Sequence, residues 1–197
     1  IFSFDFTGAK RGVLPASYDY LRLEGRMQYR LNLPPIGYSQ LMLEGGKIFG
    51  KVPYLLLKLH EGNGTYFYDR YAFSCMNFYE FSSDAWISFF YEHHFNGFLL
   101  GRVPLLKKLN WREVFVFKGV YGTLSARNDG SLPNTKAVML FPVGMSSVEH
   151  PYLETGFGIE NIFRLLRVDC IWRLTHHRAV PGLSIPTFTV NFSLNLK

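Results

Sequence analysis

The sequence lacks the features that define several large protein classes. No window approaches the run of about 18 apolar residues that a transmembrane helix requires. The first residues contain no initiator Met and neither the basic nor the apolar segment of a signal peptide. The two cysteines, Cys75 and Cys170, have no metal-like spacing. We therefore expect two thiols that are buried or face lipid, with a disulfide as the alternative, and interpret the chain as a piece of a longer, processed protein.

Motifs for phosphate binding, metal binding and nucleophilic catalysis are also missing. The chain has no Gly-rich phosphate loop and no Cys-His cluster, and no serine has the context of a nucleophile. The doublets His93-His94 and His176-His177 place neighbouring imidazoles on opposite faces of a strand, so neither doublet converges on one ion. We expect a protein that is not an enzyme, with no catalytic residue, metal site or cofactor. A Ser/His pair on neighbouring strands remains the enzymatic alternative.

The charge of the chain is moderately positive but dispersed. There are 21 basic and 15 acidic residues, which gives a formal net charge of +6. The basic residues are scattered among predicted strands and turns rather than gathered in one run. We therefore expect no nucleic-acid partner.

What the sequence does contain is alternation, most clearly at its end. Polar residues alternate with large apolar residues through 187–197, a period of two that predicts a β-strand. One wet and one apolar side are typical of a membrane-spanning barrel strand. The residues predicted to face lipid are Phe188, Val190, Phe192, Leu194 and Leu196.

Aromatic residues are abundant as well. They make up 17% of the chain, with 19 Phe and 12 Tyr. Aromatic girdles at the two membrane interfaces explain such enrichment, and the core of a large β-sandwich is the alternative.

A second clear segment, 21–33, places three arginines among its polar positions. Unpaired buried charge is very costly, so these side chains favour a water-filled or salt-bridged lumen over a packed core. The interleaved signs of the whole predicted lumen-facing set favour mutual pairing across strands, with gating or substrate passage as the alternative. That set comprises Arg22, Glu24, Arg26, Arg30, Glu44, Glu154, Glu160, Asp169 and Arg173.

The pattern predicts an all-β fold, an antiparallel transmembrane β-barrel that forms a single domain over 1–197. We expect about nine strands, and an odd number cannot comfortably close, so the chain is predicted to be the C-terminal part of a larger barrel. Missing N-terminal strands or another barrel chain would pair its free edges, and outer-membrane lipids would surround it. The predicted strands are 1–7, 21–33, 38–50, 71–82, 84–96, 111–125, 153–160, 168–177 and 187–197.

Three connections separate these strands. Residues 51–70 are predicted to be a loop, whose apolar stretch 54–59 packs under the barrel mouth or lies along the membrane interface. Residues 97–110 are predicted to contain one amphipathic helical turn, and 126–151 a long loop. The strand 111–125 has two similar faces, and its lipid side cannot be assigned.

The end of the chain resembles the last three strands of the bacterial surface antigen superfamily, which includes the BamA- and TamA-like assembly barrels. The resemblance rests on GFGIENIFRLLRVD followed by FTVNFSLNLK, with Gly156, Gly158, Arg167 and Asp169 in matching places. Residues 18–197 also resemble a narrower Bacteroidota family of outer-membrane proteins, with a carboxypeptidase-regulatory-like domain and a barrel of uncharacterised function. This resemblance rests on the sequence segments GKVPYLLLKLHEGNGTYFYDRYAF, EHHFNGFLLGRVPLLKKLNWREV and PYLETGFGIENIFRLLRVD.

The resemblance implies an integral outer-membrane protein with a role in transport, translocation or envelope assembly. Assembly barrels carry an Arg-Gly-aromatic motif in a long loop that enters the lumen, whereas here the matching connection, near Ser82 to Asp84, is predicted to be a tight turn. A structural anchor with a plugged lumen is the alternative function. A soluble β-sandwich or lipocalin-like binder is the third.

Overall fold

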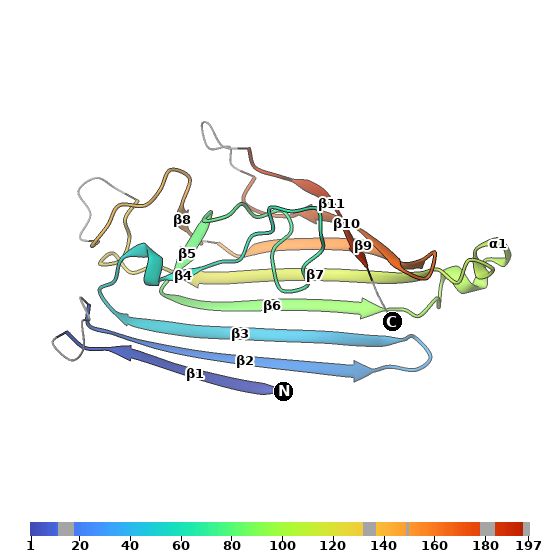
Figure 1. The fold of residues 1–197 in the computed structure, drawn as a ribbon, viewed down its shortest axis with the longest axis horizontal. Coiled ribbons are helices and arrows are strands. Elements are labelled where there is room, and N and C mark those ends of the chain that lie inside the picture. Colours follow the sequence, from blue (N-terminus) through green and yellow to red (C-terminus); the bar gives the residue numbers. More distant parts are fainter. Residues whose placement is uncertain (12–17, 132–136, 149, 178–183, 195–197) are drawn as a thin grey trace.

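The alternating segments form one antiparallel sheet in a computed structural model that describes residues 1–11, 18–131, 137–148, 150–177 and 184–194 (Figure 1). The sheet has eight strands in the order β1-β2-β3-β6-β7-β9-β10-β11. An all-β antiparallel fold is thus confirmed, as an open sheet with β1 and β11 at its edges. The strands are β1 (Phe2–Ala9), β2 (Tyr20–Asn32), β3 (Tyr38–Gly50), β6 (Ala85–His94), β7 (Arg112–Thr123), β9 (Tyr152–Ile162), β10 (Leu166–Arg173) and β11 (Phe188–Leu194).

The remaining elements are short. A small second sheet joins β4 (Lys58–Leu59), β5 (Phe81–Ser83) and β8 (Ser146–Ser147). Two 3₁₀ turns and the four-residue helix α1 make up the helical content of the described residues: Tyr54–Leu56, Leu100–Arg102 and α1 (Pro104–Lys107). The helical turn expected within 97–110 is therefore present. None of the described helices is long and apolar enough to cross a membrane.

The strand registers place each residue type on a defined face of the large sheet. Even-numbered apolar residues of β1 align with the odd-numbered residues of β2, β3 and β6, as in the series Phe4, Gly25, Gly45 and Ile87. The aligned face continues through β7 and β9 to the even-numbered residues of β10 and β11. We call this side the apolar face and the opposite side, which carries the charged residues, the polar face. Register also settles β7, where Phe115, Phe117 and Tyr121 lie on the apolar face.

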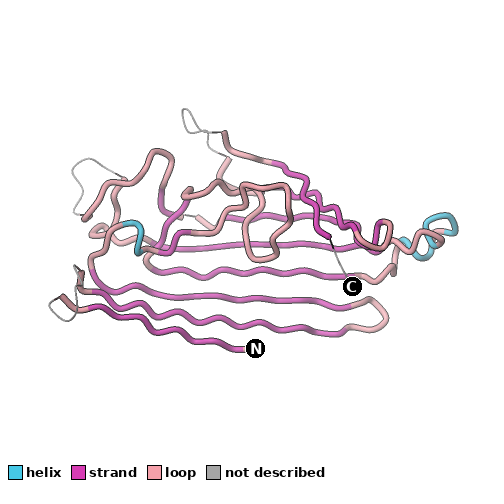
Figure 2. The backbone as a smooth tube through the Cα atoms, in the orientation of Figure 1, coloured by secondary structure: helices cyan, strands magenta, loops and turns pink. Residues whose placement is uncertain are grey.

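The connections differ in length at the two ends of the sheet. Because neighbouring strands are antiparallel, the links β1–β2, β3–β6, β7–β9 and β10–β11 share one end, and Figure 2 shows long loops there. The links β2–β3, β6–β7 and β9–β10 share the other end, where α1 lies. The two ends of the sheet therefore differ in their connections, with long loops at one end and α1 at the other.

The largest correction to the sequence prediction concerns residues 51–84, which we call the covering segment. The predicted strand 71–82 is wrong, since only Phe81–Ser83 is extended and it belongs to the small sheet. The predicted tight turn near Ser82 to Asp84 is also wrong, because it does not join two strands of the large sheet. The whole of 51–84 connects β3 to β6, and Figure 1 shows it lying across the sheet.

Apolar side chains hold the covering segment against the polar face. Phe73 and Met76 of the segment pack with Phe90 of β6 and Tyr152 of β9 in one buried cluster. Leu57 packs with Ile48, Val52 and Trp86 in a second cluster. Of the two placements predicted for 54–59, the buried Leu57 agrees with packing against the sheet.

The covering segment also reaches the edge strand β11. Phe67 forms a parallel β-bridge with Phe192, the Tyr68 amide donates to the Phe192 carbonyl (2.7 Å), and the Phe192 amide donates to the Tyr66 carbonyl (2.7 Å). Both bonds leave Phe192 on the side away from β10. At this point, the edge of β11 is paired within the chain.

Candidate functional site

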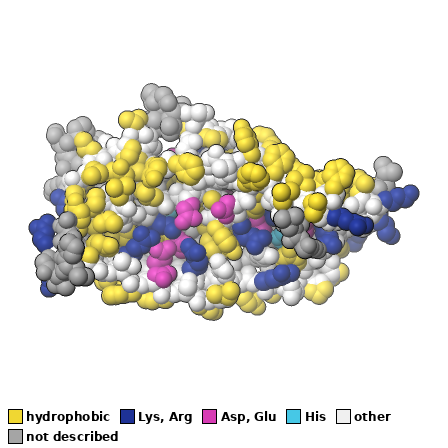
Figure 3. Space-filling view, in the orientation of Figure 1, with side chains coloured by type: hydrophobic (Ala, Val, Ile, Leu, Met, Phe, Trp, Pro, Cys, Tyr) yellow, Lys and Arg dark blue, Asp and Glu magenta, His cyan; other side chains and the backbone are white. Residues whose placement is uncertain are grey.

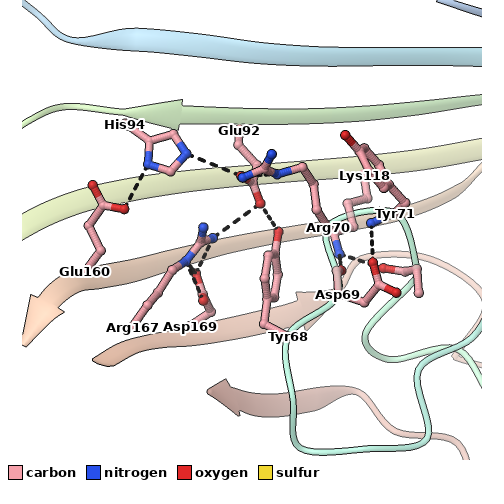
Figure 4. A network of polar contacts seen from close by, with 11 residues as sticks. Tyr68, Asp69, Arg70, Tyr71, Glu92, His94, Lys118, Glu160, Arg167 and Asp169 are labelled. Carbon is pink, nitrogen blue, oxygen red and sulfur yellow. Dashed lines mark hydrogen bonds and ion pairs between the residues drawn. The ribbon is translucent and has the colours of Figure 1, made fainter. Parts of the chain in front are cut away.

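The candidate site is the contact between the polar face and the covering segment, and it centres on Glu92 of β6. The side chain of Glu92 is 2% exposed. Its carboxylate accepts a hydrogen bond from the Tyr68 hydroxyl, one from Arg70 Nε (2.8 Å) and one from Arg167 Nη2 (3.4 Å). His94 Nε2 lies 3.3 Å from the same carboxylate. Figure 4 shows these groups converging from two strands and the covering segment.

Arg167 connects the Glu92 group to β10. Its guanidinium forms a two-pronged contact with Asp169, with Nε–Oδ2 at 2.7 Å and Nη2–Oδ1 at 2.8 Å. Tyr68 lies under this guanidinium, with 4.4 Å from Arg167 Cζ to the ring centre. Two planar contacts hold Arg167 in one orientation, and such bidentate pairing is the geometry that guanidinium favours.

His94 extends the network towards β9. Its Nδ1 lies 3.0 Å from the Glu160 carboxylate, and its ring stacks on Tyr38 at 4.5 Å between centres. His93 points to the other face of the strand, where Nδ1 lies 2.8 Å from Ser39 Oγ. The two imidazoles of this doublet therefore have separate partners, as the strand period predicts.

Lys118 of β7 is buried in the same region. Its ammonium group donates to the backbone carbonyls of Asp69 (2.7 Å) and Ala72 (2.6 Å) in the covering segment. It also lies 4.5 Å from the centre of the Tyr68 ring. In register, Lys118 is opposite Glu154, so a basic and an acidic residue are neighbours beneath the segment.

Two further charged residues of the sheet bind the covering segment. Glu154 accepts the backbone N–H groups of Ser74 (2.8 Å) and Cys75 (2.7 Å). Arg173 pairs with Glu80 through Nη2–Oε1 (2.5 Å) and Nη1–Oε2 (3.2 Å). Each is at most 3% exposed, so each would be a costly isolated charge without the segment.

A third ionic contact lies towards β2 and β3. Glu44 accepts hydrogen bonds from Arg26 Nη2 (2.5 Å) and Trp86 Nε1 (3.3 Å) and pairs with Lys58 of the covering segment (2.5 Å). Lys58 also lies 3.6 Å from Glu24, which pairs with Arg22 at 2.6 Å. The segment thus supplies a cation between two carboxylates of the sheet.

His60 is the buried neutral group of the covering segment. Its Nε2 lies 2.9 Å from Ser83 Oγ, and the side chain is 3% exposed. Burial, together with the nearby Lys58 ammonium, lowers the pKa of His60 to about 3. The imidazole therefore stays uncharged at neutral pH.

Two cavities remain between the covering segment and the sheet. One of 380 Å³ is lined by Arg30, Arg70 and Glu92 among others. The second, of 260 Å³, is lined by Glu44 and His60 among others. Both lie beside ion pairs, so the segment covers this part of the face without filling it.

The structure places the predicted lumen-facing residues together on the polar face, with two kinds of partner. Glu44, Glu154 and Arg173 bind the covering segment, whereas Glu160 and Asp169 pair within the sheet. Arg30 lies apart, with its guanidinium 3.9 Å from the centre of the Tyr38 ring. Figure 3 shows acidic and basic side chains side by side in the middle of the visible face.

The predicted lipid-facing residues of β11 lie on the apolar face. Phe188, Phe192 and Leu194 are 47%, 40% and 61% exposed, and Val190 is half-buried. Leu196 lies outside the described residues.

Sequence reasoning missed several residues of the site. The predicted charged set included none of the sheet residues Glu92, Lys118 and Arg167. It also lacked the covering-segment residues Lys58, Tyr68, Arg70 and Glu80. The segment VFVFKGVYG contains one lysine among apolar residues at strand spacing, a signal that could have identified Lys118. The residues of the covering segment have no such period, because they do not lie in a strand of the large sheet.

Among the described residues, no group of three or more His, Cys, Asp or Glu side chains is arranged to hold a metal ion. Both cysteines are free thiols, with Cys75 buried and Cys170 half-buried. The expected alternative of a disulfide between them is therefore wrong for this structure.

Comparison with known proteins gives one family. The model described as "Family of unknown function (DUF5686) C-terminal domain" matches residues 1–126. A search among curated proteins found no match. The matched range contains β1 to β7 and the covering segment, including Lys58, Arg70 and Glu92. The polar residues of β9 and β10 lie beyond it.

Proposed function

The chain belongs to the DUF5686 family, through its C-terminal domain, and from that premise we propose that it is an integral outer-membrane β-barrel protein. In this proposal the eight-stranded sheet is the C-terminal part of the barrel wall. Its apolar face contacts lipid, and its polar face lines the lumen. The protein acts in transport, translocation or envelope assembly, and is related to the surface antigen superfamily.

One observation carries the proposal: exposed large apolar side chains cover one face of all eight strands. Monomeric soluble proteins rarely expose contiguous apolar patches larger than a few hundred Å². The alternation of apolar and polar residues along each strand is the pattern of a barrel wall between lipid and lumen. One such residue from each strand, in sheet order, is Phe4, Tyr29, Phe49, Ile87, Tyr121, Phe157, Trp172 and Leu194, all at least 41% exposed.

The opposite face supports a lumen closed by the covering segment. Glu92, Lys118, Glu154 and Arg173 are buried charges, and each is bound by the segment. A soluble sheet of this size would bury apolar residues here and expose the charges. Here the segment neutralises the charged side, while the apolar side remains bare.

A plugged structural anchor is the second candidate, and the density of contacts favours it. Lys58, Arg70 and Glu80 bind three separate carboxylates or guanidinium groups of the sheet. Moving the segment would break these buried pairs together. Transport or translocation therefore requires a partner or substrate that replaces these ion pairs. A structural anchor can keep all of them.

Two native tryptophans on opposite faces provide the test. Trp172 is on the apolar face and 41% exposed, whereas Trp86 is on the polar face and 6% exposed. Two variants of the complete protein, W86F/W111F and W111F/W172F, each retain one of them. We expect lipids brominated on their acyl chains to quench Trp172 strongly and Trp86 weakly, because quenching requires contact with the chains.

The same samples give the opposing outcome. A water-soluble protein that shows neither quenching nor heat-modifiable migration would exclude the barrel and favour a soluble sandwich. Equal quenching of both tryptophans would contradict the assignment of the two faces.

A further inference from the structure

The end of the sheet that carries α1 has an unusual surface, which we call the basic end. It consists of residues 97–110 between β6 and β7 and residues 161–165, which comprise the last two residues of β9 and its link to β10. The two stretches are joined by a hydrogen bond from Asn161 Nδ2 to the Asn110 carbonyl (2.7 Å). They therefore form one continuous surface, although they are far apart in the sequence.

Cations project from both stretches of the basic end. Arg102, Lys107, Lys108 and Arg164 are all exposed, and neither stretch contains Asp or Glu. Figure 3 shows basic side chains gathered at the same end as α1. The Arg102 guanidinium lies 4.2 Å from the centre of the Phe98 ring.

The adjoining carboxylates do not neutralise these cations. Glu113 accepts the backbone N–H of Leu100, and Glu160 pairs with His94. Within the described part of the chain, neither acid forms an ion pair with Arg102, Lys107, Lys108 or Arg164. The exposed cations of the basic end keep their charge available to a partner.

Large apolar side chains are exposed among the cations. Phe163 is 87% exposed, more than any apolar residue of the neighbouring strands β6, β7, β9 and β10. Leu99, Val103, Leu109 and Leu165 are between 44% and 53% exposed. Apolar residues mixed with Lys and Arg are typical of segments that lie in the boundary between headgroups and acyl chains.

We propose that the basic end is a docking surface for the headgroups of an anionic phospholipid leaflet. Its cations bind lipid phosphates, while Phe163 and its apolar neighbours enter the upper acyl region. Charge complementarity identifies the occupant. Anionic headgroups attract the cations, and the acyl chains beneath them accommodate the exposed apolar side chains. The inference rests on the proposed barrel, since it places this end at the membrane boundary. It adds a lipid preference, which the barrel alone does not imply.

Trp111 is a native reporter for this surface, because it lies directly between residues 97–110 and β7 and is half-buried. The variant W86F/W172F of the complete protein retains Trp111 alone. Reconstitution in mixed vesicles then gives the relative binding constant of brominated phosphatidylglycerol against brominated phosphatidylcholine. For one lipid headgroup beside one basic side chain we expect a preference for the anionic lipid of about fivefold, which is the factor that corresponds to about 1 kcal/mol. High salt should reduce it.

Matched charge variants decide the assignment. R102Q/K107Q/K108Q removes three cations of the basic end and should bring the preference close to one. K10Q/K51Q/R127Q removes three exposed cations that follow β1, β3 and β7 at the opposite end, and should leave the preference unchanged.

The outcomes separate this inference from the proposed function. Equal quenching of Trp111 by the two lipids would overturn the inference while leaving the barrel intact, and an acidic protein would then be the better occupant. An equal loss of preference in both charge variants would also overturn it. Absence of quenching by either lipid, for Trp111 and Trp172 alike, would instead contradict the barrel itself.

Discussion

At the scale of single residues, Glu92 shows how the polar face depends on the covering segment. Four side chains meet its carboxylate, two of them from the segment. The strand period placed Glu92 and His94 on one face, so their proximity was predictable. Their contact with Tyr68 and Arg70 was not, because no period links a residue in a loop to one in a strand.

Replacing Glu92 tests whether the network stabilises the fold. In Glu92→Ala, the guanidinium groups of Arg70 and Arg167 lose a shared buried partner. We expect the free energy of unfolding to fall by about 3–5 kcal/mol, the usual cost of breaking a buried ion pair. Urea titration of the vesicle-inserted protein, followed by heat-modifiable migration, measures the change.

Glu61→Ala is the matched control for this residue. Glu61 is a carboxylate of the covering segment 3.8 Å from Lys58, but its side chain is 60% exposed. An exposed pair contributes about 0–1 kcal/mol. Comparable losses in the two variants would contradict a special role for the buried network around Glu92.

At the scale of elements, the strands of the large sheet were predictable and the covering segment was not. Along each of these strands one face is apolar and the other polar, so its residues alternate. In the segment, the successive residues Ala72, Phe73, Ser74, Cys75 and Met76 are all buried. A stretch surrounded on all sides carries no period, so the sequence of 71–82 does not distinguish it from a strand.

The thiol of Cys75 reports the docking of the covering segment. Burial raises the pKa of Cys75 to about 12, and its backbone N–H is bound by Glu154. Maleimide should therefore label it very slowly at pH 7.5 in a C170S background. Glu154→Leu removes the acceptor of the Ser74 and Cys75 N–H groups, and we expect labelling at least tenfold faster, since each lost bond to a charged group costs about 1.5–3 kcal/mol.

The control for this prediction is Glu160→Gln, which changes a carboxylate of the same strand that binds His94 and not the covering segment. It should leave the labelling of Cys75 slow. Fast labelling in the unsubstituted C170S protein would show that the segment is undocked in the membrane.

At the scale of the whole molecule, the covering segment lies on the face of the sheet that carries the charged residues. In the proposed barrel the apolar face contacts lipid, whereas the polar face has counter-charges that the segment provides. The number of strands in the sheet is eight because 71–82 belongs to the segment. The segment then becomes a long link from β3 to β6, in the place where a tight turn was predicted.

Deleting most of the covering segment tests whether this segment closes the proposed lumen. β4 and β5 pair with Lys58 opposite Ser83, and the His60 amide donates to the Phe81 carbonyl (3.1 Å). Residues 61–80 can therefore be replaced by Asn-Gly, a two-residue link that suits a β-hairpin. In planar bilayers, we expect the complete protein to be silent and the shortened variant to show stable conductance steps, because hydrated charges would line its lumen.

Folding of the shortened variant is verified by heat-modifiable migration, so that a silent bilayer has a definite meaning. A folded but silent variant would contradict closure by residues 61–80. Voltage-dependent opening of the complete protein would favour transport or translocation, because the ion pairs of Lys58, Arg70 and Glu80 would then release under a physiological force. If the complete protein stays closed while the shortened variant conducts, the structural anchor is favoured. The free energy of those ion pairs then exceeds the energy that the applied voltage supplies.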